Sequence, residues 1–413
     1  MIREIKYEKL GKLAEFKNGI NYRRGSAGSK VRIINVKELV SMGIIDDNVS
    51  LPTIELEEIK YRPYLLKEND IVIARSASPG EVVLFKGVKE TIYSGFSIKI
   101  SFGNNIYPEF LYYYLQFYKK RVINASNGTI FQNLNQKILS EIDFPMINFD
   151  LQVNVVRILS ALDDKIEVNN KINSTLEELA QTLYKRWFVD FEFPNEEGKP
   201  YKSSGGEMVD SELGLIPKGW DYRRIDEIAN VRIGRTPPRK EPIWFSNNSN
   251  DIKWYSIKDM GNSGVFMDAS SEYLTNEAIE NFNVPIIEPD RVLVSFKLTV
   301  GRVAITTDSC ATNEAIAHFI PYGDNIKSSY LYLLLKNYNF DALGNTSSIA
   351  TAVNSKSIKS IKVLVPNDEI LGKFSIIVDN VFQKIKNGSF ENSSLMKLRD
   401  LLLPKLMSGE IEV

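Results

Sequence analysis

The stretch that decides the fold is residues 151–188, LQVNVVRILSALDDKIEVNNKINSTLEELAQTLYKRWF, because its apolar side chains recur in steps of three and four. That spacing places them on one face of a long amphipathic helix and is typical of a heptad stripe. The stripe uses positions 151, 155, 158, 162, 172, 176, 179 and 183. About 37 residues, at a rise of 1.5 Å each, predict a rod of roughly 55 Å, far longer than the mean globular helix.

The chain also contains an internal repeat. A shift of 219 residues places residues 151–183 on residues 370–402, so the chain ends in a second copy of the helix. Upstream, with small gaps, residues 31–39 fall on residues 252–260. The repeat predicts two similar heads, each followed by a long helix, with pseudo-twofold symmetry. This organisation suits a target that is itself read in two halves.

Each head is expected to have an α+β fold. The runs Asp70–Ala74 and Arg291–Ser295 are rich in apolar and β-branched residues and predict buried strands, whereas Phe110–Leu115 and Tyr330–Leu335 predict matching helices. A Pro-, Gly- and Ser-rich segment precedes the second head. The predicted parts are the first head (1–150), the first long helix (151–190), a linker (191–211), the second head (212–367) and the second long helix (368–408).

The two long helices are expected to pack on each other, because either one alone would leave its apolar stripe in water. The economical arrangement is an antiparallel pair with one head near each end. Both stripes weaken in the middle, at Asn169-Asn170 and at Asn387-Gly388. Either these polar midpoints meet and fix the register, or each helix bends or breaks there, since a Gly in a helix interior costs about 1 kcal/mol.

The composition is that of a soluble, folded protein. The chain has 413 residues, 43% hydrophobic and 25% charged, and a net charge of −1. It has no apolar run long enough to span a membrane and no N-terminal apolar stretch typical of a secretory signal, so we expect a cytoplasmic location. Cys310 is the single cysteine, which excludes an intrachain disulfide. A nearly neutral chain can bind nucleic acid only through clustered charge.

The sequence contains no pattern that carries an enzyme mechanism, and we expect the chain to be non-catalytic. His318 is the only histidine and stands in an apolar run, which favours a core residue over a metal ligand. Asp70 and Asp290 recur in both heads, but each precedes a strand, which favours a turn-forming Asp over a catalytic pair. Phosphate-cradling glycine loops are absent from the sequence.

Candidate contacts to a partner are basic, amide and hydroxyl residues in loops at similar points of the two heads. Arg reads guanine, Asn or Gln reads adenine, and Ser or Thr contacts phosphate, so such loops are suited to reading a DNA groove. The framework matches between heads whereas these residues differ, which predicts two different half-sequences. The candidates in the first head are Tyr22, Arg23, Arg24, Lys30, Arg75, Ser76, Asn127, Thr129 and Gln132. Those in the second head are Arg232, Arg235, Arg239, Lys240, Lys297, Asn345, Ser347 and Ser348.

Three stretches resemble the DNA-specificity (S) subunit of type I restriction-modification enzymes, and the resemblance spans the whole chain. They are LEELAQTLYKRWFVDF at 176–191, DSELGLIPKGW at 210–220 and LLPKLMSGEI at 402–411. The resemblance implies two target-recognition domains, each of which reads one half of a bipartite double-stranded DNA site, and an antiparallel helix pair that sets the spacer between the halves. Half-sites one DNA turn apart, with three or four base pairs read by each head, would leave a spacer of about 6 or 7 base pairs.

The resemblance also implies partners. Two methylation (M) subunits are expected, with restriction (R) subunits in the nuclease form, and S-adenosylmethionine, ATP and Mg²⁺ are expected on those partners. The exposed faces of the paired helices are the expected docking surface for M subunits. Trp187, Phe188 and Leu406-Met407, at the ends of the stripes, either cap the helix pair or contact an M subunit.

Two other functions are compatible with the residues. One is a two-headed scaffold that binds proteins and never contacts DNA. The other is a recognition module detached from a single-chain methyltransferase-nuclease. The sequence has no Asn/Asp-Pro-Pro-Tyr/Phe methyltransferase motif, so in that case too catalysis would belong to another chain.

Overall fold

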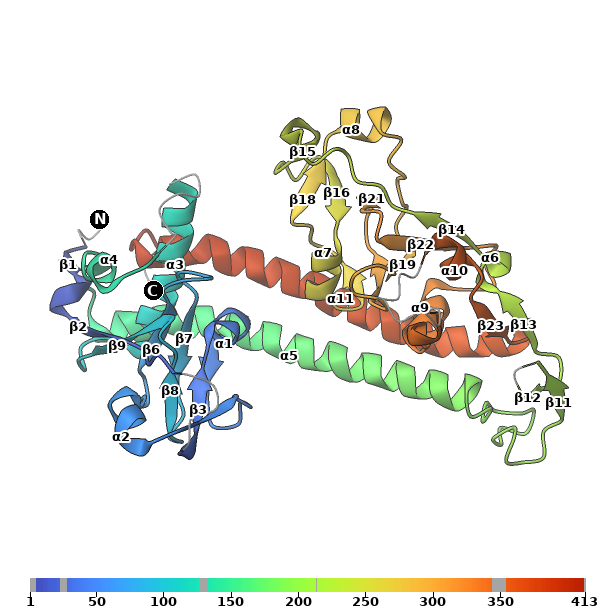
Figure 1. Cartoon of the computed structure of the whole chain (residues 1–413), viewed down its shortest axis with the longest axis horizontal. Helices are drawn as coiled ribbons and strands as arrows, with labels where there is room; N and C mark the ends of the chain where they lie inside the picture. The colour runs from blue at the N-terminus through green and yellow to red at the C-terminus, as the bar shows by residue number, and fades with distance from the viewer. Residues whose placement is uncertain (1–4, 23–27, 126–132, 213, 344–353, 412–413) are drawn as a thin grey trace. The chain divides into compact units, whose positions relative to one another are not determined.

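The computed structural model describes residues 5–22, 28–125, 133–212, 214–343 and 354–411. The chain forms two compact units, residues 1–164 with 395–413, and residues 165–394. Each unit contains one head and a part of both long helices (Figure 1). The α+β class and the presence of two similar heads are confirmed.

The first head is built on a five-stranded sheet and a smaller three-stranded sheet, and the strands of the two sheets are interleaved along the sequence. The five strands, in spatial order, are β2 (Ala14–Asn18), β9 (Ser97–Phe102), β6 (Ile71–Ala74), β7 (Val82–Phe85) and β4 (Ile44–Ile45). The three-stranded sheet is β5 (Thr53–Leu56), β3 (Ser29–Ile34) and β8 (Thr91–Tyr93), and β1 (Tyr7–Lys9) pairs with β10 (Asp143–Pro145). The helices are α1 (Val36–Ser41), α2 (Glu58–Tyr61), α3 (Pro108–Ala125) and α4 (Gln136–Ser140), with 3₁₀ turns at Leu10–Lys12 and Arg62–Tyr64.

The second head repeats this plan. Its five-stranded sheet is β14 (Ala229–Ile233), β22 (Ile316–Pro321), β19 (Val292–Ser295), β20 (Val303–Thr306) and β17 (Phe266–Met267). The smaller sheet is β15 (Phe245–Ser246), β18 (Glu272–Leu274), β16 (Ile252–Tyr255) and β21 (Cys310–Thr312), and two hairpin-like pairs are β11 (Met208–Ser211) with β12 (Gly214–Pro217) and β13 (Asp221–Arg224) with β23 (Lys362–Val365). The helices are α6 (Ile225–Ile228), α7 (Ile257–Asn262), α8 (Asn276–Asn281), α9 (Ser328–Lys336) and α10 (Ser355–Lys359), with 3₁₀ turns at Pro242–Trp244 and Phe340–Leu343.

The two five-stranded sheets have the same strand order and the same strand directions. In each, the first four strands pair antiparallel and the short edge strand pairs parallel. Strands β6 and β19 are buried along their whole length, as their β-branched residues predict. Asp70 stands immediately before β6, and its carboxylate accepts the backbone N–H of Lys67. Asp290 stands two residues before β19 with a φ of +59°, so the turn interpretation is confirmed.

The long helices are α5 (Phe149–Phe188) and α11 (Asp368–Met407), 40 residues each. They are antiparallel within the second unit, because Asn169 meets Asn392 whereas Asn173, further along α5, meets the earlier Ser389 of α11 (Figure 1). The first unit holds the remaining parts, where Asp163 of α5 pairs with Arg399 of α11.

The polar midpoint fixes register rather than breaking the helices. Asn169 is buried and donates to the side-chain oxygens of Asn392 (2.9 Å) and Glu391 (2.8 Å), and Asn392 donates to Asn170. The expected meeting of Asn169-Asn170 with Asn387-Gly388 is wrong by about one helical turn. Gly388 instead faces Asn173, where a Cβ would lie 2.6 Å from the Asn173 amide oxygen, so glycine permits a close approach of the helices.

The prediction of the apolar stripe on α5 is partly wrong. Ile172 and Leu179 were expected in the buried stripe but are 50% and 56% exposed, whereas Asn169 and Ala180 are buried in their stead. The reason is that α5 contributes side chains to the core of the second head in addition to packing on α11. Trp187 and Phe188 are buried against Phe374 and the core of the second head, and Leu406-Met407 are buried in the core of the first unit, which favours the capping interpretation over an exposed contact.

The segment 191–211, predicted as a linker, has order of its own. Phe193 is buried and stacks between Tyr201 (ring centroids 4.5 Å) and Trp220 (5.1 Å), and the segment ends in strand β11. The Gly- and Ser-rich part lies in turns between these anchors. The aromatic residues therefore tie this segment to the second unit.

Candidate nucleic-acid interface

One end of each five-stranded sheet gathers two loops that the sequence singled out and a third that it did not. In the first head the singled-out segments are 19–22 and 75–81, and the third is 94–96. In the second head they are 234–241 and 296–302, with 313–315 as the third. We call each group the loop end of its head. The backbone N–H of Arg75 donates to Phe96 (2.9 Å), and at the same place in the second head Phe296 donates to Ala315 (2.9 Å). The loop ends therefore share one backbone framework.

Two glycines let the first loop of each group lie close to its neighbour. Gly19 donates its N–H to Ser97, and Gly234 donates to Ile316 at the equivalent position. A Cβ on Gly19 would lie 2.1 Å from the carbonyl oxygen of Ser94, and one on Gly234 would lie 2.1 Å from the hydroxyl of Thr312. Both positions require glycine because the chain approaches the next strand at backbone distance.

The loop end of the first head holds three of the predicted residues that the structure describes. Tyr22 is half-buried, and its hydroxyl donates to Asn35 (3.2 Å). Arg75 and Ser76 are half-buried, and the Arg75 carbonyl accepts from the N–H of Leu134, which brings residues 133–135 to the same place. Lys30 is exposed on β3, opposite Glu55 of β5, and lies outside the loop end.

The loop end of the second head holds Arg235, Arg239, Lys240 and Lys297, all exposed. Arg235 donates to the carbonyl of Phe282 (2.7 Å). Within the described residues, neither Lys240 nor Lys297 forms a salt bridge, and the Lys297 ammonium lies over the ring of Phe296 (5.5 Å to the centroid). Arg232 is exposed but stands in the middle of β14, opposite His318, rather than at the loop end.

Arg239 is already engaged by its own head. Its guanidinium forms a bidentate ion pair with Glu272, at 2.8 Å for both contacts, and lies over the rings of Phe245 (4.1 Å) and Trp254 (4.5 Å). A base contact by the same fork would compete with Glu272. Arg239 therefore braces the 234–241 segment against the smaller sheet.

A carboxylate sits among these cations. Glu314 accepts from the hydroxyl of Thr236, and this hydrogen bond, with the nearby charges of Lys297 and Arg239, lowers the pKa of Glu314 below its ordinary 4.5. An ionised Glu314 weakens the positive field at this end. It also offers an acceptor to base amino groups, of the kind that reads cytosine.

The remaining predicted residues lie outside the described residues. They are Arg23, Arg24, Asn127, Thr129, Gln132, Asn345, Ser347 and Ser348. Their roles stay predictions.

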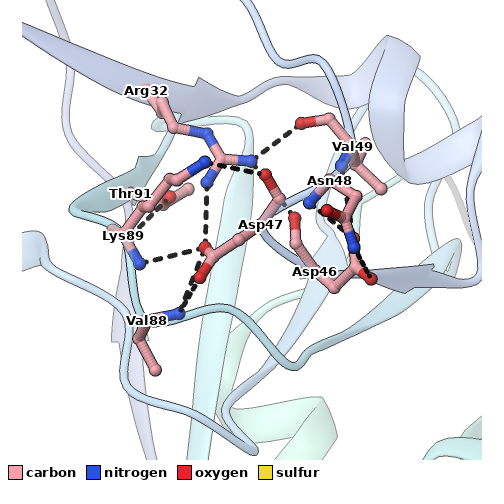
Figure 2. A network of polar contacts seen from close by, with 8 residues as sticks. All are labelled: Arg32, Asp46, Asp47, Asn48, Val49, Val88, Lys89 and Thr91. Atoms are coloured by element: carbon pink, nitrogen blue, oxygen red, sulfur yellow. Dashed lines mark hydrogen bonds and ion pairs between the residues drawn. The ribbon is translucent and has the colours of Figure 1, made fainter.

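Arg32, on β3, is a second cation that stabilises the framework of the first head. Arg32 on β3 donates to the carbonyl oxygen of Asp46 (3.2 Å) and to the carboxylate of Asp47 (3.2 Å), as Figure 2 shows. The same carboxylate accepts the backbone N–H groups of Lys89 (3.0 Å) and Val88 (3.1 Å). These backbone hydrogen bonds, and then Arg32, lower the pKa of Asp47 below its ordinary 3.8. Arg32 thus joins the loop after β4 to the loop after β7.

The second head has the same brace with a different cation. Lys253 of β16 pairs with Cys310 of β21, just as Arg32 of β3 pairs with Thr91 of β8. The two cations therefore occupy equivalent positions in the two heads. Its ammonium donates to the carbonyl oxygen of Asp268 (2.7 Å), after β17, and pairs with Asp308, after β20. Because each cation is used inside its head, we regard Arg32 and Lys253 as positioning residues.

His318 is a core residue, as predicted. It lies on β22 with no exposed surface, and its Nε2 is 2.6 Å from the hydroxyl of Thr312. Burial, and then the charge of Arg232, lower the His318 pKa to about 3, so the ring is neutral at neutral pH. Among the described residues, no group of three or more His, Cys, Asp or Glu side chains is placed to hold a metal ion. No helix in the described part of the chain is both long and apolar enough to cross a membrane.

Sequence reasoning missed two apolar residues at the loop ends. Phe96 is 62% exposed and Leu298 is 96% exposed, although apolar residues beside strands are usually buried. The available signal was their position, since Phe96 follows Ser94-Gly95 and Leu298 stands between Lys297 and Thr299.

The duplicated heads, with matched frameworks and different loops, define a protein with two recognition domains. The chain belongs to the family of type I restriction modification DNA specificity domains, whose sequence model matches twice, over residues 4–178 and 217–392.

The curated relatives carry the same assignment. The chain is 27% identical to the type I restriction enzyme HindI specificity subunit of Haemophilus influenzae, over 75% of this chain and 78% of the relative. It is 29% identical to the MjaIX specificity subunit of Methanocaldococcus jannaschii, over 75% of this chain and 70% of the relative. Its fold is similar to the crystal structure of a type I restriction-modification S subunit from M. genitalium, with a TM-score of 0.52, 17% identity and coverage of 98% and 96% of the two chains.

Proposed function

We propose that this chain is the DNA-specificity subunit of a type I restriction-modification complex, and that each head reads one half of a bipartite double-stranded site. The observation that carries the proposal is the duplication itself. The framework of the two loop ends is the same to the level of individual backbone hydrogen bonds, whereas the side chains on it differ, as Ile20 and Arg235 do at equivalent positions. Equal frameworks with unequal side chains suit a site with two different halves.

The paired helices are proposed to set the spacer between the half-sites. Each is 40 residues long, and the buried hydrogen bond from Asn169 to Asn392 favours one register of the pair. A helix pair with one register behaves as a ruler rather than a flexible tether. The exposed side chains Val168, Ile172 and Leu179 on α5 belong to the face proposed to dock methylation subunits.

Catalysis is proposed to belong to partner subunits. Methylation subunits would bind S-adenosylmethionine, and restriction subunits, in the nuclease form, would use ATP and Mg²⁺. Support comes from the sequence, which has one histidine, one cysteine and no phosphate-binding glycine loop. Partner subunits would also supply phosphate contacts, which accounts for a DNA-reading chain with a net charge of −1.

Methylome sequencing of the host, with and without this gene, tests the proposal. We expect one bipartite methylated motif to disappear on deletion and to return with the intact gene. Binding of the purified complex to a duplex that carries this motif should fall steeply as salt rises, because phosphate contacts release counterions. Two results together would instead favour a two-headed protein scaffold. They are unchanged methylation on deletion and duplex binding that depends on neither DNA sequence nor salt concentration.

A further inference from the structure

The loop between β6 and β7 and the loop between β19 and β20 have the same backbone conformation. Ala77 in the first and Leu298 in the second have φ values of +65° and +61°, and Gly80 and Gly301, three residues later, have a φ of +86° each. The Gly80 N–H donates to the carbonyl of Ala74 (2.9 Å), as Gly301 donates to Ser295 (2.8 Å). One rigid loop shape is therefore repeated at both loop ends.

Leu298 stands at a position that L-residues rarely adopt. A left-handed backbone favours glycine or asparagine, and a branched aliphatic residue there is disfavoured. Leu298 also gains no burial in return, because its side chain is 96% exposed. A side chain that is unfavourable for the backbone and contributes nothing to the core is best explained by an external contact.

The first head presents its apolar side chain from the adjacent loop. Ala77, small and exposed, occupies the position of Leu298, whereas Phe96, 62% exposed, occupies the position of Ala315, which is 6% exposed. Each loop end therefore carries one large exposed apolar side chain, contributed by one of two neighbouring loops. Different placement on a common framework is what two different half-sites would require.

The surroundings of Leu298 favour DNA as the occupant. Lys240 and Lys297 form no salt bridge within the described residues, and both belong to the same loop end. Phosphates take up cations at the rim of a groove, while an apolar tip reaches the bases between them. Leu and Phe are among the apolar residues that proteins insert between base steps.

We propose that Leu298 in the second head and Phe96 in the first are specificity-determining residues that contact bases directly, by inserting their apolar side chains into the groove of the half-site. This inference rests on the proposed function. The left-handed backbone at Leu298 aims the side chain away from the head, so the contact needs no rearrangement of the loop. Lys297 contributes charge to the same encounter without reading sequence.

The test uses the full chain in complex with its methylation subunits. We compare affinity for a duplex carrying the methylated motif with affinity for an unrelated duplex, over a salt series. Leu298→Ala should lower affinity for the motif about tenfold or more and leave the unrelated duplex unchanged, with the same salt slope. Leu298→Met, which keeps an apolar side chain of similar length, should retain most of the specificity. The matched control Lys297→Gln should weaken both duplexes alike and reduce the salt slope by about one.

The half-site readout separates the two heads. Leu298→Ala should relax recognition in one half of the motif only, and Phe96→Ala in the other half only. An unchanged ratio of motif to unrelated affinity in Leu298→Ala would overturn the inference, as would weaker binding of methylation subunits with DNA recognition intact. Failure of the proposed function is distinguishable, because the unsubstituted complex would then bind both duplexes equally.

Discussion

Lengthening both long helices by one turn would test the proposed ruler. Four helix-forming residues are inserted between Asp164 and Lys165 in α5, and four more between Ser394 and Leu395 in α11. These points are the boundaries between the two compact units, so packing inside each unit, including the pair of Asn169 and Asn392, is unchanged. The insertion changes only the lengths of α5 and α11 at the boundary between the units.

The expected change follows from helix geometry. Four residues add about 6 Å along the axis and rotate the helix by about 40° beyond one full turn. One base pair of B-DNA adds about 3.4 Å and rotates the duplex by roughly 35°. The rotation corresponds to one base pair and the translation to nearly two. We therefore expect a spacer longer by one base pair, or two at most, with both half-sites unchanged.

Methylome sequencing of a host that expresses the lengthened chain reads the new motif directly. Insertion into α5 alone is the matched control, because helices of unequal length cannot stay paired between the units, and specific methylation should be lost. A lengthened chain that recognises the original spacer would refute the ruler. So would an altered half-site at an unchanged spacer.

Three further predictions concern the framework. Asn169→Leu should lower the free energy of unfolding by about 1–3 kcal/mol in denaturant titration, because the buried side-chain oxygen of Asn392 loses its donor, whereas leucine at both positions should recover most of the loss. Arg32→Met should cost about 1–3 kcal/mol by the same measurement, and Arg32→Lys should cost less, since Lys253 performs this role in the second head; equal losses would contradict the brace. His318, with a folded pKa of about 3 against 6.5 ordinarily, binds fewer protons folded than unfolded, so its contribution is present above pH 6.5 and is lost on acidification. Relative to His318→Gln, stability should fall by about 1.4 kcal/mol per pH unit below pH 6; parallel pH profiles would disprove a buried neutral ring.

Local pattern was enough to predict the long helices and the core strands. The stripe from residue 151 to 183 predicts a helix wherever its apolar face is buried, and β6 and β19 are buried on both faces because their sequences are almost wholly apolar. The internal repeat predicted two heads of one fold. Some of the predicted loop residues gather as well, among them Arg75 and Lys297, since antiparallel strands return to the same end of a sheet and bring residues 75 and 296 beside the ends of their neighbours, whereas Lys30 and Arg232 lie along strands.

The rest depended on contacts between residues distant in the sequence. Burial of Asn169 and exposure of Ile172 follow from the register of α5 against α11, and no single helix contains that information. Arg239 looks like a free cation in sequence, yet Glu272, 33 residues away, occupies its guanidinium. The left-handed Leu298 could not be predicted from its residue type, because its loop is shaped by the strands it connects. Periodicity and composition act over a few residues and decide the elements, whereas the tertiary structure decides which side chains remain available for recognition.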